Sequence, residues 1–151
     1  MRTSSISVER KALFATAFSM AFVSLSCSAD QWPAHPMPTK LSEVAAHSAL
    51  IKIRPSFKQC LGDAGGSTPP TKDCMDDEYD YQDGRLNLVY KQLMVSLSKD
   101  GQAKLREEER RWIRFRDGYC NKEEAELASY GCEIEMAADR ATQLEDRLKS
   151  R

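Results

Sequence analysis

The sequence ERRWIRFRDGYC, from Glu109 to Cys120, decides the fold because it mixes four arginines with four large apolar or aromatic side chains. Such a stretch is typical either of a basic, aromatic surface that grips nucleic acid or of one wall of a helical core. The series Leu105, Trp112, Phe115 and Tyr119 follows helical spacing, with Ile113 and Cys120 on its flank. One apolar stripe on a helix favours the core wall.

Two neighbouring segments repeat this period, one before and one after the opening stretch. Their apolar positions are Leu86, Val89, Tyr90, Leu93, Met94 and Leu97 in the first, and Ile134, Ala137, Ala141, Leu144 and Leu148 in the second. Turns are expected at Ser98–Gly101 and near Tyr130. Because short connections make sequential helices antiparallel neighbours, we expect an all-α fold. It is a small antiparallel helical bundle, made of a long helical hairpin and a C-terminal helix.

The hairpin also predicts which residues face each other. A turn centred near residue 99 or 100 places Asp83 opposite Arg116, Asn87 opposite Trp112 and Tyr90 opposite Glu109. We expect a carboxylate–guanidinium pair at the first position and polar partners for Asn87 and Tyr90. All six residues are interpreted as architecture.

Residues 1–29 have the pattern of a secretory signal peptide. A basic start, MRTSSISVERK, precedes an apolar run from Ala12 to Ser26 that is too short for a membrane span. Small residues at Cys27 and Ala29 suit cleavage before Asp30. Lipidation at Cys27 is the alternative, although Leu25 stands at position −2, where a lipobox has it at −3. We expect a periplasmic or secreted protein, or a lipoprotein anchored in the membrane through Cys27.

The charge balance excludes one class of partner. The leader has a net charge of +2 and the whole chain −1, which leaves about −3 on the remaining 122 residues. Because nucleic-acid binders are usually strongly basic, we expect no nucleic-acid partner. Residues 30–56 are expected to form an N-terminal extension with a possible short helix, and residues 57–151 the helical domain.

Without the leader, four cysteines remain: Cys60, Cys74, Cys120 and Cys132. An even number in an exported chain indicates two disulfides. No pair has C-x-x-C spacing, and His35 and His47 lie far from the cysteines, so no metal or cofactor is expected. An apex near residue 126 places Cys120 opposite Cys132 and leaves Cys60 with Cys74 across a loop predicted at 62–71. A Cys74–Cys120 pair is the alternative.

Two sequences carry a family resemblance: QDGRLNLVYKQLMVSL at 82–97 and LREEERRWIRFRDGYC at 105–120. They resemble the LprI-like lysozyme inhibitor family over roughly residues 57–149. The matching positions are Asp83, Leu86, Asn87, Tyr90, Leu93, Trp112, Phe115, Arg116, Asp117, Cys120, Cys132 and Arg140. The chain departs from the pattern at Ala137, where threonine is usual, and in the short stretch between Cys120 and Cys132. The resemblance implies a protein that binds a lysozyme-type hydrolase.

Six acids crowd the eleven residues from Asp73 to Asp83, opposed only by Lys72. If Cys74 opens a helix, these acids lie in its N-terminal turns on a solvated face, where the helix dipole favours them. A second interpretation is a negative surface that steers a cationic partner such as a lysozyme-type hydrolase. Its residues are Asp76, Asp77, Glu78 and Asp80, beside the loop predicted at 62–71.

Catalysis is not expected, because no Ser–His or Cys–His arrangement could activate a nucleophile. Two alternatives to a lysozyme inhibitor remain. One is a periplasmic immunity protein against a secreted wall-degrading effector, and the other is a non-catalytic envelope binding module.

Overall fold

The computed structural model describes residues 41–123 and 125–151, in which all regular secondary structure is helical. The helices are α1 (Leu41–Leu50), α2 (Pro55–Ala64), α3 (Thr68–Ser96), α4 (Lys99–Cys120) and α5 (Glu126–Lys149). The predicted all-α bundle is therefore confirmed. The expected leader and its processing sites lie outside the described residues. No helix in the described ranges is long and apolar enough to cross a membrane.

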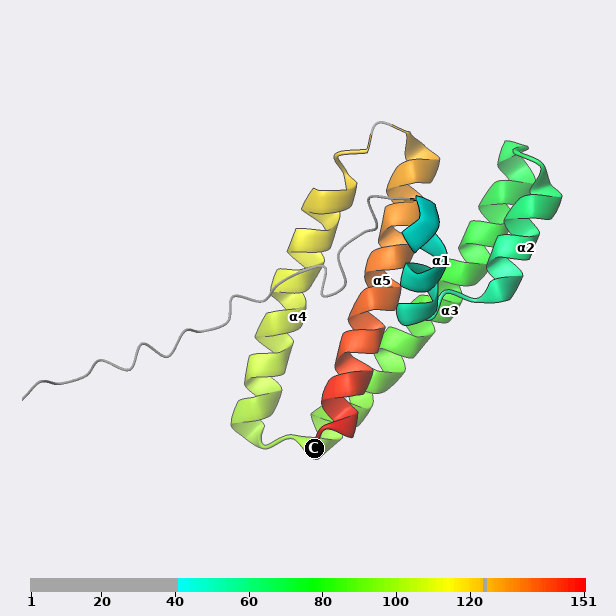
Figure 1. The fold of residues 1–151 in the computed structure, drawn as a ribbon. Helices are drawn as coiled ribbons and strands as arrows, with labels where there is room; N and C mark the ends of the chain where they lie inside the picture. The colour runs from blue at the N-terminus through cyan, green and yellow to red at the C-terminus, as the bar shows by residue number, and fades with distance from the viewer. Residues whose placement is uncertain (1–40, 124) are drawn as a thin grey trace, which may run out of the picture.

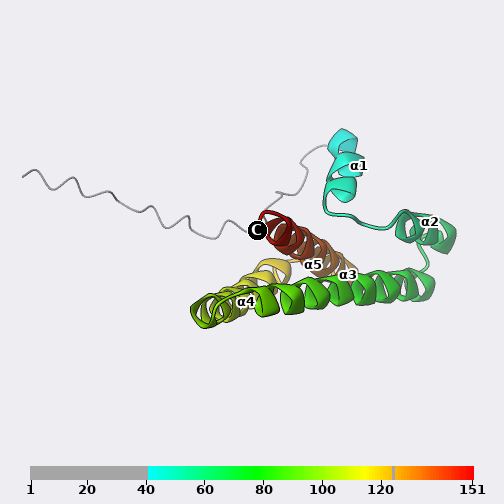
Figure 2. The same cartoon turned by 90° about the horizontal axis from the view of Figure 1, so that it is seen from below.

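Helices α3 and α4 form the predicted hairpin and α5 packs against both (Figure 1). The hairpin is splayed: α3 and α4 meet at their turn and diverge away from it (Figure 1). In the view from below, α1, α2 and α5 all lie on one side of α3 (Figure 2). Helix α5 packs along α3 much more extensively than α4 does. The C-terminal helix is therefore the main partner of α3, and α4 leaves part of the α3 surface uncovered.

The core consists of the stripes that the sequence predicted. The side chains of Leu93, Leu105 and Leu144 are completely buried, and Trp112 is only 2% exposed. Trp112 is therefore part of a core wall, as predicted. Tyr119 differs from the prediction, because it is 37% exposed and stacks on Phe115 instead of facing another helix. It lies in the last turn of α4, at the end where α4 has diverged from α3 (Figure 1).

The turn between α3 and α4 is short because local interactions close both helix ends. Ser98 caps α4, its Oγ accepting a hydrogen bond from the Gly101 N–H at 3.2 Å. Gln102 Nε2 donates to the carbonyls of Met94 and Leu97 at the end of α3. A Cβ on Gly101 would lie 2.8 Å from Leu97 Cδ2, so glycine allows this close approach.

Two predictions about the start of α3 are wrong. The loop predicted at 62–71 is only the turn between α2 and α3, with Gly65 and Gly66 at φ values of 57° and 80°. Helix α3 begins at Thr68 rather than at Cys74. Proline is tolerated in the first turn of a helix, because the backbone N–H that it lacks would have no acceptor within the helix there.

The cysteines pair as favoured, Cys60 with Cys74 and Cys120 with Cys132. The first disulfide links α2 to α3 and the second links the end of α4 to α5. The predicted short helix is also present as α1. Ile51, which follows α1, is fully buried, so the packed unit begins before residue 57.

Candidate functional site

A groove between α3 and α4 gathers the residues that carry the family pattern. Its volume is about 360 Å³, and its lining includes Asp83, Leu86, Asn87, Tyr90, Arg106, Glu109, Arg110, Trp112, Ile113 and Arg116. The hairpin register predicted from the turn brings these positions together. Trp112 lies beneath the groove in the core, while Asn87 and Ile113 are exposed along it.

The rim of this groove is held by pairs within each helix instead of the predicted pair across it. Asn87 Nδ2 donates to Asp83 Oδ2 at 2.7 Å, one turn away on α3. Arg116 donates to Asp117 at 2.8 and 3.0 Å and lies over the Trp112 ring, 5.3 Å from its centre. The expected Asp83–Arg116 pair is therefore wrong: Asp83 pairs with Asn87, and Arg116 pairs with Asp117. Because the helices diverge, Asp83 and Arg116 each find a nearer partner on their own helix. Glu109, expected opposite Tyr90, accepts from Arg140 on α5 instead.

Behind the groove, a buried arginine ties α5 to α4. Arg140 is 1% exposed and donates to Glu108, Glu109 and Gln143. Arg147 adds a bond to Glu108 at 2.9 Å. Burial raises the Glu109 pKa, whereas Arg140 and Arg147 outweigh burial at Glu108 and lower its pKa. The sequence marked Arg140 only through the family resemblance and gave no sign of its partners.

An acidic stripe lies on the exposed side of α3. At about 100° per residue, its five members fall within an arc of about 120°: Asp73, Asp76, Asp77, Asp80 and Asp83. Asp77 is the most exposed carboxylate in an ion pair, with a side chain 76% accessible. The stripe ends at Asp83 on the groove rim, so the acidic stripe and the groove form one continuous surface.

Glu78 does not belong to this stripe, and its expected exposure is wrong. It points about 160° away from Asp80 around the helix and is completely buried. Its carboxylate accepts bonds from Arg54 Nε at 2.7 Å and from Gln82 Nε2 at 2.6 Å. Glu78 therefore fastens the segment before α2 to α3 and is not available to a partner.

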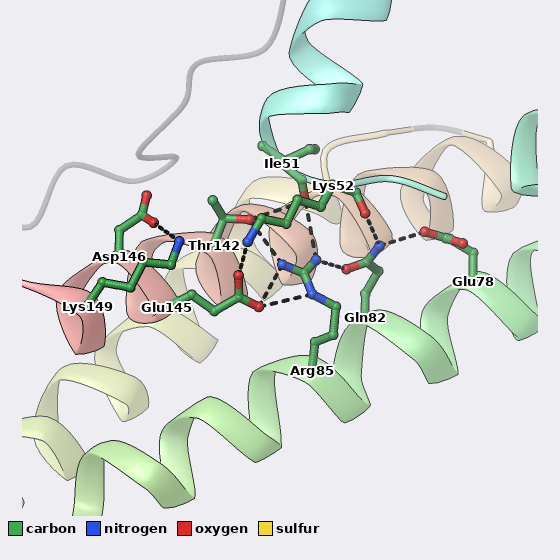
Figure 3. Close-up of polar contacts among 9 residues, drawn as sticks. All are labelled: Ile51, Lys52, Glu78, Gln82, Arg85, Thr142, Glu145, Asp146 and Lys149. Carbon is green, nitrogen blue, oxygen red and sulfur yellow. Dashed lines mark hydrogen bonds and ion pairs between the residues drawn. The ribbon is translucent and has the colours of Figure 1, made fainter. Parts of the chain in front are cut away.

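The buried network around Glu78 extends to α5 (Figure 3). Gln82 donates to the Lys52 carbonyl at 3.0 Å, and Arg85 donates to Glu145 at 2.9 Å. Burial opposes the charge of Glu145, but Lys52 and Arg85 outweigh it and lower the Glu145 pKa. These contacts hold the linker after α1 against α3 and α5, and the sequence gave no signal for them.

Like Asp77, which pairs with Arg54 at 2.7 Å, Asp76 is held by neighbouring groups. The Tyr130 hydroxyl donates to its carboxylate at 2.7 Å, and Lys72 lies 3.1 Å away. These two donors lower the Asp76 pKa, while burial and Asp76 raise that of Tyr130. Asp73, Asp77 and Asp80 are the exposed members of the stripe.

Comparison with protein families gives a match to the model described as "Lysozyme inhibitor LprI" over residues 60–144, more than half of the chain. The chain belongs to the LprI family. Comparison with curated proteins and with solved structures gives no significant match. In this LprI domain, the matched segment runs from the first disulfide to the buried end of α5 and contains the groove, the acidic stripe and the Arg140 cluster. No group of three His, Cys, Asp or Glu within 41–123 and 125–151 could hold a metal ion.

Proposed function

We propose that this protein binds and inhibits a cationic, lysozyme-type peptidoglycan hydrolase and performs no chemistry of its own. Family membership supplies the class of partner. The acidic stripe supplies the approach, because a line of carboxylates raises the association rate of a positively charged protein. The continuity of the stripe with the α3–α4 groove is the observation that carries this proposal.

The stripe is suited to docking because its geometry is fixed by the opposite face of α3. Met75, Leu86 and Leu93 are buried on that face, and the Cys60–Cys74 disulfide ties its N-terminal part to α2. The carboxylates therefore keep their spacing on a rigid helix, so little conformational entropy is lost when a partner binds. Asp77 and Asp80 are the acids that a partner would contact most directly, whereas the buried Glu78 stabilises the fold.

The groove would extend this contact beyond charge. It offers apolar surface from Leu86 and Ile113 next to the carboxylate of Asp83. A lysine or arginine side chain of the partner fits such a place, since its stem is apolar and its head is cationic. Interface energy is usually concentrated in a few such buried anchors.

For the whole chain, we propose export through the leader at residues 1–29, with the helical domain at 57–151 acting in the periplasm or outside the cell. Lipidation at Cys27 would tether the same domain to a membrane. Either location places an inhibitor where wall hydrolases attack.

The experiment is a turbidity assay in which a panel of lysozymes digests wall fragments with and without the purified protein. Inhibition at micromolar or lower concentration of at least one cationic lysozyme is expected. If no lysozyme is bound or slowed, the inhibitor proposal fails, and an immunity protein or envelope binding module becomes the better explanation.

A further inference from the structure

A second pocket lies on the far side of α3 from the acidic stripe, among α1, α2, α3 and α5. Its volume is about 640 Å³, within the range of small-molecule sites. Six apolar side chains line it: Val44, Ile53, Phe57, Leu61, Met75 and Ile134. Ser48, Lys58, Gly131 and Glu135 complete the wall. We call it the α1–α2 pocket.

Glu135 is the unusual member of this wall. It lies on α5, partly buried, and burial raises its pKa while the nearby His47 lowers it. Among the described residues, no hydrogen bond or ion pair satisfies its carboxylate. Buried carboxylates are normally paired, because an unpaired charge in apolar surroundings is costly. The pocket wall therefore carries a partly buried carboxylate that has no donor among the described residues.

A second polar group close to Glu135 also lacks a partner. His47 is 9% exposed, and its Nε2 atom is buried without a hydrogen bond within the described part of the chain. His47 also lowers the Glu135 pKa, so the two side chains lie near one another. Glu135, which lines the pocket, would be satisfied by a ligand that brings N–H donors.

Lys58 does not supply those donors. It is exposed on α2, so its ammonium group is solvated on a flexible stem at the edge of the pocket. Glu135, in contrast, is held by a long helix packed along α3. The fixed charge in the pocket is thus negative, and it is surrounded by apolar side chains.

We propose that the α1–α2 pocket binds a small amphiphile with an apolar body and a single amine head, the head donating to Glu135. The six apolar residues enclose the body. An anionic amphiphile of the same length would place its head against the Glu135 carboxylate and is disfavoured. This site is separate from the acidic stripe and does not depend on inhibition of a hydrolase.

The test uses three probes with equal chains, decylamine, decanol and decanoate, titrated below their aggregation concentrations into the purified protein by calorimetry. Decylamine is expected to bind at least tenfold more tightly than the other two. Amide shifts of Gly131 and Ile134 in NMR spectra should follow the titration. Equal affinity for all three probes, tighter binding of decanoate, or no decylamine binding at millimolar concentration would each overturn the proposal.

Three variants locate the head group. Glu135→Gln keeps the shape and should weaken decylamine binding at least tenfold, as expected for loss of a charge-assisted contact. Lys58→Gln, the matched control on the rim, should leave it within about twofold. Val44→Arg places a cation at an exposed edge of the pocket and should also abolish binding. Circular dichroism confirms folding of each variant. Unchanged affinity in folded Glu135→Gln, or loss of affinity in Lys58→Gln, would overturn the assignment.

Discussion

Replacing Arg140 by methionine should lower the free energy of unfolding by about 3–5 kcal/mol at pH 7, the cost of removing one partner from a buried charge cluster. Methionine fills much of the space of the arginine stem, so the loss is mainly electrostatic. The side chains of Glu108 and Glu109 are only 18% and 15% accessible. Without Arg140, the Glu109 carboxylate loses the cation that is hydrogen-bonded to it, while Glu108 still has its ion pair with Arg147.

The pH dependence follows from the same contacts. Arg140 now holds the Glu108 pKa below its usual value of 4.5, whereas burial already raises that of Glu109. In Arg140→Met, burial should raise the pKa of both Glu108 and Glu109. A carboxyl whose pKa is higher in the folded state destabilises the protein above that pKa, and protonation relieves the penalty as the pH falls. The deficit of Arg140→Met should therefore be full at pH 7 and smaller near pH 4.

Urea unfolding with intact disulfides, at pH 7 and at pH 4, measures this difference. Arg110→Met is the matched control, because Arg110 is exposed and should change the unfolding free energy by less than about 0.5 kcal/mol. Adding Glu108→Gln and Glu109→Gln to Arg140→Met should restore much of the loss. A deficit below about 1 kcal/mol, or one that is equal at both pH values, would refute the reasoning.

Three further outcomes are expected. Trp112→Ala should cost about 3–5 kcal/mol of unfolding free energy, and a loss below about 1 kcal/mol would place the indole at the surface. Glu78→Gln should destabilise by about 1–3 kcal/mol, because it weakens the bonds from Arg54, whereas Asp80→Asn should change stability by less than about 0.5 kcal/mol. Equal effects in urea unfolding would contradict the division of these acids between core and surface. Peptide mapping without reduction should recover Cys60–Cys74 and Cys120–Cys132, and replacing the second pair by alanine should cost about 3 kcal/mol. A Cys74–Cys120 peptide would contradict the fold.

Helical periodicity was sufficient to predict the three long helices and most of their core, because their apolar positions repeat. The turn expected near Tyr130 is wrong, since Tyr130 lies inside α5, which begins at Glu126. The cap at Ser98 and the local disulfides also follow from neighbours in the sequence. The start of α3 was not predictable in this way, because Pro69 and Pro70 are equally typical of a loop and of a first helical turn.

The acidic residues show a second limit. In the sequence, Glu78 belongs to the cluster of acids around Asp76. In the helix, however, its side chain lies on the buried side. Once α3 is known to be helical there, the angle between Glu78 and Asp80 separates them. The contacts of Arg140 could not be predicted from its neighbours, because its partners Glu108 and Glu109 are 32 and 31 residues away in the sequence. No local pattern encodes such a contact, nor the α1–α2 pocket, which four helices form together.

The most direct test of the proposed docking surface is the rate at which the protein associates with an inhibited lysozyme. The stripe variant Asp73→Asn, Asp77→Asn, Asp80→Asn removes three exposed charges and spares Glu78. The control variant Asp100→Asn, Glu107→Gln, Glu123→Gln removes three exposed charges on and beyond α4.

Stopped-flow or surface-binding kinetics at low salt and at about 0.15 M salt, where the Debye length is about 8 Å, give the association rate constants. The wild-type rate should fall as salt is added. At low salt, the stripe variant should associate at least tenfold more slowly, and the control should stay within about twofold of wild type. Equal rates for the stripe variant and the control, or no dependence of the wild-type rate on salt, would contradict docking through the acidic stripe.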